Sequence, residues 1–147
     1  ELVSPAGLRR LPLAEFYVND GIKNSVLASD EILTRVLVPR PNAERRMAFQ
    51  KLRVRGAIDF PMLNLALAFD LAEGVLSAPS VVVSAIAARP RALKRLPEGL
   101  LTEGLIEDFC ARAFQSVRPL TNINGDLVWR REMVPVLLRR AFAEARA

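Results

Sequence analysis

One segment in the middle of the chain, Lys51 to Pro61, combines residue types that could do chemistry. Cations stand on both sides of an expected strand end, Gly56 lets another group approach the backbone closely, and Asp59 follows a short turn. Such a polar corner could face an anionic or redox-active small molecule. A simpler interpretation is that Asp59 caps the turn and pairs with Arg55, and these residues alone leave both interpretations open.

The usual catalytic and metal-binding constellations are missing elsewhere in the sequence. The chain has no histidine, which excludes histidine metal sites, Ser-His-Asp triads and Cys-His nucleophile pairs. Its seven glycines form neither a Gly-x-Gly-x-x-Gly motif nor a Walker loop, so we expect no backbone cradle for a pyrophosphate. The single cysteine, Cys110, lies on the apolar stripe of an expected helix, and we predict a core residue and not a reactive thiol. The sequence therefore offers few residues with which a free-standing enzyme could carry out catalysis.

The composition is that of an ordinary globular domain. The chain has 147 residues, of which 51% are hydrophobic and 25% are charged, and we expect a single domain over residues 1–147. No apolar run approaches the ~20 residues that a membrane span needs, and the single cysteine gives no sign of an oxidising compartment, so we expect a cytoplasmic protein with no membrane partner. The sequence begins at Glu1 without a methionine, which suggests a piece of a longer polypeptide.

The charge balance raises an alternative function. Twenty-one basic residues against 16 acidic ones give a net charge of +5, and a basic domain can be a binding module for nucleic acid or for an acidic protein partner. The arginines, however, are scattered as short pairs, and no segment interleaves them with aromatic residues as a base-stacking surface would. We therefore expect no nucleic-acid partner and keep the basic binding module as the second hypothesis.

The hydrophobic pattern predicts strands first and helices last. Turn-forming residues on both sides favour a short edge strand over 8–13, although its alternation is poor. Period-two alternation favours a strand over 31–38 and one over 45–55 with a bulge near Lys51. Strands over 63–71 and 75–87 follow, joined by a hairpin turn at Ala72-Glu73-Gly74. Helical periodicity then predicts a helix from the N-cap Thr102 through Val117, and a second from the N-cap Asp126 to about Arg146 with Pro135 inside it. The prediction is an α+β fold in which an antiparallel β-meander sheet packs against C-terminal helices.

Several segments, in this order, carry a resemblance to a known family. The central one is Phe49-x-Lys51-x3-Arg55-x3-Asp59, and two earlier segments and two later ones agree with it. Together they resemble the C-terminal domain of the flavoprotein subunit of molybdenum hydroxylases, a family that includes carbon monoxide dehydrogenase, xanthine dehydrogenase and 4-hydroxybenzoyl-CoA reductase. The supporting segments are Gly7–Arg10 with Phe16, Leu27–Leu33 with Val38-Pro39, Ala88–Ala92, and Leu120–Met133 with Leu137-x2-Arg140-Ala141.

The resemblance implies an accessory domain that helps to move electrons in an FAD-dependent oxidoreductase and is not catalytic by itself. In the family, FAD lies mainly on two preceding domains of the same subunit, while molybdopterin and iron–sulfur clusters lie on partner subunits. FAD is therefore not expected to stay bound to this piece alone. Carried over to this sequence, Lys51 would place a cation near the flavin ring, and Arg55 and Asp59 would tune or order the loop.

Two strings favour one branch of that family. Arg55–Pro61 and Leu120-Thr121-Asn122 are more similar to the 4-hydroxybenzoyl-CoA reductase branch than to the xanthine branch. The middle of the loop is Gly56-Ala57-Ile58, whereas the xanthine dehydrogenase branch carries more charge there, so roles in NAD gating are not transferred. The stretch from Arg95 to Leu100 also departs from the family pattern, because Pro97 shortens any helix there.

Overall fold

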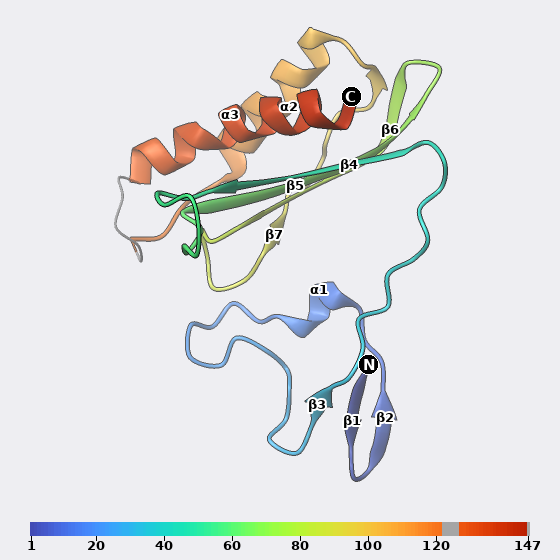
Figure 1. Ribbon diagram of the computed structural model, residues 1–147, viewed down its shortest axis with the longest axis vertical. Coiled ribbons are helices and arrows are strands. Elements are labelled where there is room, and N and C mark those ends of the chain that lie inside the picture. The colour runs from blue at the N-terminus through green and yellow to red at the C-terminus, as the bar shows by residue number, and fades with distance from the viewer. Residues whose placement is uncertain (122–126, 147) are drawn as a thin grey trace. The chain divides into compact units, whose positions relative to one another are not determined.

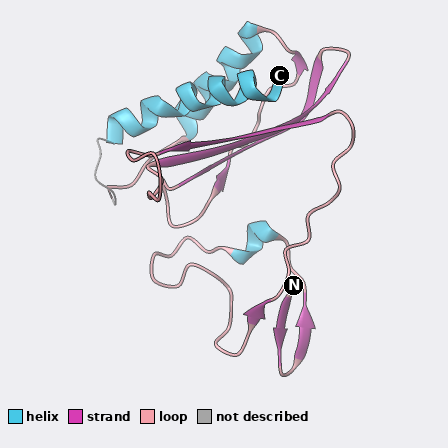
Figure 2. Cartoon of the chain, in the orientation of Figure 1, coloured by secondary structure: helices cyan, strands magenta, loops and turns pink. Residues whose placement is uncertain are grey.

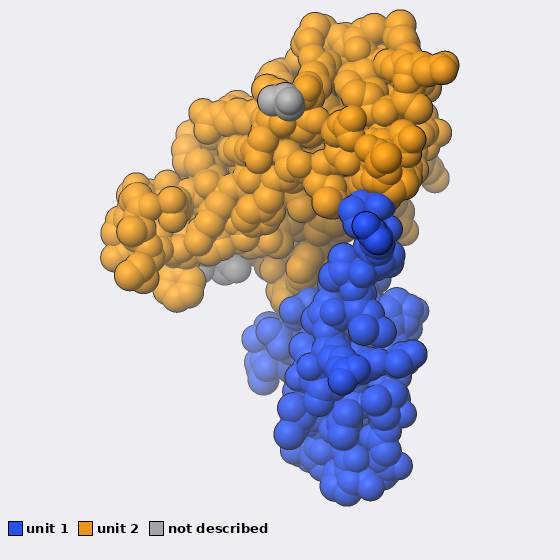
Figure 3. Space-filling model, turned by 45° about the vertical axis from the view of Figure 1, so that its right-hand side comes forward, with its two compact units in different colours: residues 1–41 blue, residues 42–147 orange. Residues whose placement is uncertain are grey.

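The computed structural model describes residues 1–121 and 127–146 and divides the chain into two compact units. One unit contains residues 1–41 and the other residues 42–147, and Figure 3 colours them separately. Figure 1 labels the helices and strands of both units. The sequence predicted one domain over residues 1–147. That the two units form one domain stays a prediction.

The first unit is a small antiparallel sheet with one short helix. Its strands β1 (Leu2–Ser4), β2 (Gly7–Arg9) and β3 (Ile32–Leu33) lie in the order β2-β1-β3, and α1 spans Leu13–Phe16. Arg9 and the backbone N–H of Ala28 both donate to the carboxylate of Glu31, and these bonds, that of Arg9 first, lower the pKa of Glu31 to about 2.

Both strands predicted for the first unit are shorter than expected. The edge strand predicted over 8–13 ends at Arg9, because Pro12 has no backbone N–H for a ladder and instead caps the start of α1. The strand predicted over 31–38 is only Ile32–Leu33, which pairs with β1 at two positions, and the backbone of Thr34 and Arg35 then bonds to Glu1. Alternation alone did not indicate how short the neighbouring strand is.

The second unit contains the larger sheet. Strands β4 (Arg45–Leu52), β5 (Leu63–Ala72), β6 (Val75–Ser84) and β7 (Arg91–Ala92) lie in that order, all antiparallel, and β8 (Gly99–Leu100) also pairs with β6. The turn between β5 and β6 has positive φ at both Glu73 (51°) and Gly74 (77°), which is the backbone that a two-residue hairpin needs. This confirms the predicted meander and its hairpin.

The bulge predicted near Lys51 is wrong. The β4–β5 register runs without a shift from Arg45 opposite Asp70 to Leu52 opposite Leu63, and the irregularity lies instead between Ala68 and Asp70 in the β5–β6 pair. The apparent slip in phase arose because Met47 and Phe49 are apolar but face away from the core, where 62% and 58% of each residue's surface is exposed. Leu52 simply belongs to the opposite face of the strand.

Two helices cover one face of this sheet (Figures 1 and 2). The first, α2 (Glu103–Ser116), begins as predicted after Thr102, whose side-chain oxygen accepts the N–H of Leu105 at 3.2 Å. The second, α3 (Leu127–Arg146), contains Pro135, and its predicted cap Asp126 lies outside the described residues. α3 packs on β4 and β5, α2 packs on α3, and the buried side chains of both helices form one continuous core with the inward side chains of β5. The core is lined by Leu63, Leu65, Leu67, Phe69, Val81, Val83, Ile106, Phe109, Val134, Leu137, Leu138 and Phe142.

Phe142 joins the two helices to the sheet, and its removal tests this packing. Its ring lies 5.1 Å from the ring of Phe109 on α2 and 5.5 Å from that of Phe69 on β5, measured between centroids. We expect Phe142→Ala to lower the free energy of unfolding by about 3–5 kcal/mol, because it leaves a cavity between three elements. Phe49→Ala, on the open face, should change it by less than about 0.5 kcal/mol. Urea denaturation measures both, and equal losses would contradict this description of the core.

Candidate functional site

The loop of residues 53–61 connects β4 to β5 and carries most of the predicted site. Its two ends are held together, because Leu52 pairs with Leu63 and the backbone N–H of Met62 donates to the carbonyl of Leu52 at 2.8 Å. We call this closure the neck of the loop.

Asp59 organises the interior of the loop. Its Oδ2 accepts the backbone N–H groups of Val54 at 3.0 Å and Arg55 at 2.8 Å, and its Oδ1 lies 3.2 Å from Nη2 of Arg55. These bonds, with that from the Arg55 N–H the largest, lower the pKa of Asp59. The simpler interpretation of the sequence is therefore realised: Asp59 caps the turn and pairs with Arg55.

Lys51 lies apart from that pair, as the next-to-last residue of β4. It is exposed, and it stands opposite Asn64 on the face of the sheet that the helices leave open. The structure therefore joins two of the three predicted site residues, Arg55 and Asp59, and leaves Lys51 beside them as a cation on the open face. A role for any of the three in binding a cofactor stays a prediction.

The loop also presents apolar side chains to solvent. Val54, Ile58 and Phe60 are 80%, 92% and 85% exposed, and Ile58 adopts a positive φ of 43°, which is unusual for a β-branched residue. Beside the loop, Met47 and Phe49 form the edge of a shallow apolar hollow on the open face, over the small side chains of Ala66 and Ala68. Grouped exposed apolar residues of this kind are typical of a contact surface.

Arg130 is a residue of this region that the sequence analysis did not single out. It is fully buried, with an exposed fraction of 0%, and its guanidinium donates to carbonyl oxygens at the foot of the loop and at two neighbouring segments. One signal in the sequence could have found it. Arg130 stands four residues before Val134 and seven before Leu137, so it lies on the apolar stripe of α3.

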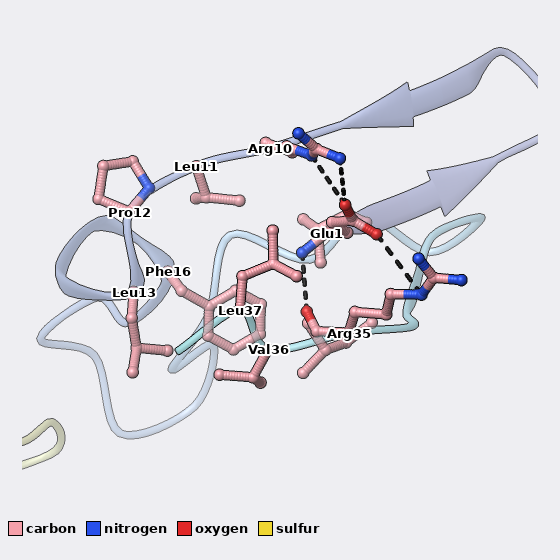
Figure 4. A pocket seen from close by; sticks show the side chains of 11 residues that line it. Glu1, Arg10, Leu11, Pro12, Leu13, Phe16, Arg35, Val36 and Leu37 are labelled. Carbon is pink, nitrogen blue, oxygen red and sulfur yellow. Dashed lines mark hydrogen bonds and ion pairs between the residues drawn. The ribbon is translucent and has the colours of Figure 1, made fainter. Parts of the chain in front are cut away.

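The first unit has a hollow of its own, shown in Figure 4. Its walls are mostly apolar, and the charged groups at its rim bind one another: Glu1 pairs with Arg10 at 2.6 Å and with Arg35 at 3.8 Å. None of the predicted site residues lines it. The apolar wall consists of Leu2, Leu11, Pro12, Leu13, Phe16, Leu33, Val36 and Leu37.

Cys110 is a core residue, as predicted. It is 3% exposed, its thiol donates to the carbonyl of Pro135 at 3.7 Å, and burial raises its pKa to about 11. A thiol with such a pKa is a poor nucleophile at neutral pH. Within residues 1–121 and 127–146, no group of three or more acidic or cysteine side chains could hold a metal ion, and no helix is long and apolar enough to cross a membrane.

Residues 47–145 match the family of the CO dehydrogenase flavoprotein C-terminal domain. The chain belongs to that family. The match covers β4 through α3, including the loop and its neck, and begins after the first unit. The family resemblance seen in the sequence is thus confirmed at this level.

Similar proteins include a subunit of a nicotinate dehydrogenase and chains of two CO dehydrogenases. The chain is 26% identical over 149 residues to the nicotinate dehydrogenase FAD-subunit of Eubacterium barkeri, which covers 97% of this chain and 50% of that relative. Its fold is similar to that of chains in CO dehydrogenase from Hydrogenophaga pseudoflava (19% identity, TM-score 0.87, covering 98% of this chain and 50% of that one). CO dehydrogenase from Oligotropha carboxidovorans gives 24% identity and a TM-score of 0.84, covering 98% and 51%. The chain thus spans about half the length of these relatives.

The Asp59 interactions predict how the loop responds to substitution. In Asp59→Ala, the N–H groups of Val54 and Arg55 lose their acceptor, so their hydrogen exchange should accelerate, whereas Asp59→Asn keeps an acceptor oxygen and should retain part of the protection. Since the pKa of folded Asp59 is lowered, its contribution is present above about pH 4 and is lost as the pH falls through the folded pKa. Exchange measured by NMR checks both effects, and unchanged protection in Asp59→Ala would contradict the capping role.

Proposed function

We propose that this chain is the C-terminal part of an FAD-containing flavoprotein subunit in a molybdenum-hydroxylase-type oxidoreductase. There it closes the FAD site and supports electron transfer between the flavin and iron–sulfur clusters on a partner subunit. The observation that carries the proposal is the family match over residues 47–145, which includes the whole Lys51–Asp59 motif. A relative described as an FAD subunit, with twice the matched length, supports the same assignment.

The residues of the loop fit one wall of a flavin site. Bound flavin supplies the reversible uptake and release of electrons, and negative charge accumulates on its ring when it is reduced. Lys51 offers a solvent-exposed cation for that charge, while Arg55 and Asp59, paired with each other, act by holding the loop in shape. The exposed side chains of Ile58 and Phe60 offer apolar contacts.

Most of the FAD would be held outside this chain. The sequence has no glycine-rich loop for the pyrophosphate, so the preceding FAD-binding domains of the same subunit would supply that part of the site. The apolar hollow at Met47 and Phe49 and the apolar tips of the loop support packing against such a neighbour. The chain would therefore be an accessory part, not catalytic by itself, of a cytoplasmic assembly with molybdopterin and iron–sulfur subunits.

Within the family, the proposed branch is that of 4-hydroxybenzoyl-CoA reductase. The Arg55–Pro61 and Leu120–Asn122 strings favour 4-hydroxybenzoyl-CoA reductase, whereas the relative that is 26% identical over 149 residues is a nicotinate dehydrogenase subunit. Assay of the assembled enzyme with a 4-hydroxybenzoyl thioester and with nicotinate tests this: turnover of the thioester alone supports the reductase branch, and turnover of nicotinate alone contradicts it.

Lys51 gives the direct test of the flavin wall. In the full FAD-loaded subunit, Lys51→Met should lower the flavin midpoint potential by about 30 mV for a two-electron couple, a tenfold change in the equilibrium with reduced flavin. The expected reason is the loss of a cation that stabilises the reduced, anionic ring. Folding should change little, because Lys51 is exposed. Spectroelectrochemistry measures the potential.

Lys94→Met provides the matched control, because it removes another exposed lysine of the second unit, after β7. Its potential should equal that of the wild type. If Lys51→Met leaves the potential unchanged but lowers the unfolding temperature by several degrees, Lys51 is a structural residue and the flavin wall lies elsewhere.

A further inference from the structure

Arg130 holds three separate segments of the second unit at one point. Its Nε donates to the carbonyl of Met62 at 3.0 Å, its Nη1 to that of Leu120 at 2.9 Å, and its Nη2 to that of Ala85. Met62 is the foot of the loop of residues 53–61, and Ala85 follows β6 with a positive φ of 65°. One side chain of α3 thus fixes the loop foot, the end of a central strand and the segment that leads toward α3.

Burying the charged side chain of Arg130 costs free energy, which its three hydrogen bonds must offset. Arg130 is fully buried, and burial lowers its pKa, which reflects the penalty on a cation removed from water. A guanidinium nevertheless keeps its charge in proteins, and its planar fork can bind carbonyls in three directions at once. A leucine at this position of the apolar stripe would pack without that penalty, but it could bind none of the three carbonyls.

The bonds of Met62 show how Arg130 controls the loop. The N–H of Met62 closes the neck by donating to Leu52, and its carbonyl accepts from Arg130, so both polar groups of this one residue are fixed. Asp59, three residues earlier, then fixes the interior through Val54 and Arg55. The position of Lys51 relative to the loop therefore depends on an anchor in the core of the helix layer.

We propose that Arg130 is a positioning residue: it anchors the neck of the 53–61 loop and so sets the geometry that this loop and Lys51 present to a bound flavin. The part that concerns the flavin rests on the proposed function, whereas the anchoring of the loop does not.

The first experiment measures the loop in the chain itself. Arg130→Lys keeps the charge but replaces the fork with a single nitrogen, so the amides of Val54, Arg55 and Met62 should exchange faster, on the order of tenfold or more, while core amides of β5 follow the global stability. The matched control is Arg131→Lys. Arg131 is the neighbour on the same helix, and it binds the carbonyl of Phe114 at 2.8 Å and covers that ring at 4.1 Å, away from the loop. Arg131→Lys should leave loop exchange unchanged.

A second measurement needs no variant and covers the case in which Arg130→Lys does not fold. In the wild-type chain, the Nε–H of Arg130 and the amide of Met62 should exchange with the same opening free energy, below that of the β5 core, because the neck opens as one unit. The proposal is overturned if the Nε–H exchanges only through global unfolding while Met62 opens locally. Equal exchange of loop and core in Arg130→Lys also overturns it.

The flavin potential then separates the two levels of the proposal. In the FAD-loaded subunit, we expect Arg130→Lys to shift the midpoint potential in the same direction as Lys51→Met, and Arg131→Lys to leave it unchanged. If Lys51→Met shifts the potential and Arg130→Lys loosens the loop without shifting it, the positioning role fails while the proposed function stands. If neither variant shifts the potential, the flavin wall does not lie at Lys51 and the flavin part of this proposal fails, while faster loop exchange still identifies Arg130 as the anchor.

Discussion

The two-sided alternation of β5 is the constraint on which the rest of the second unit depends. Its inward side chains, from Leu63 to Phe69, form the layer on which α3 packs, with α2 against α3 in the same core, and its outward side chains are small. Because β4 pairs with β5 without a register shift, the same alternation decides which residues of β4 face the helices. Gln50 thus reaches Glu144 on α3, whereas Phe49 and Lys51 stand on the open face.

A second constraint is the buried guanidinium at the end of this layer. An antiparallel pair could be closed by a short turn, but here β4 and β5 are separated by a long loop whose ends meet at Leu52 and Met62. Backbone carbonyls that leave the ladder at such a point need donors, and one arginine on the adjacent helix supplies three. The shape of an exposed loop is in this way tied to the hydrophobic core.

The sequence predicted the elements whose pattern and local chemistry agree. The period of β5, the Glu73-Gly74 turn and the Thr102 cap each combine a clear pattern with a residue suited to the position, and all three are found. The phase of β4 was misinterpreted because apolar residues in an alternating pattern indicate burial, whereas Met47 and Phe49 lie exposed on the open face. No periodicity can reveal that such a face is left uncovered.

Part of the candidate site could likewise be predicted from the sequence, and part could not. The contact between Arg55 and Asp59 follows from their spacing across a turn, and it could be predicted as the simpler of two interpretations. Arg130 was overlooked because an arginine is usually a surface residue, although its place in the apolar stripe of α3 indicates the opposite. The partner of Lys51 could not be derived from the chain, because the proposed partner consists of atoms outside it.

The most direct test of the account is an experimental structure of the full subunit with FAD bound. We expect Nζ of Lys51 to lie within about 3 Å of an oxygen or nitrogen on the flavin ring, with the 53–61 loop beside it closed by Met62 and Arg130. A ring that lies more than roughly 10 Å from Lys51, where even an exposed charge is largely screened, would contradict it.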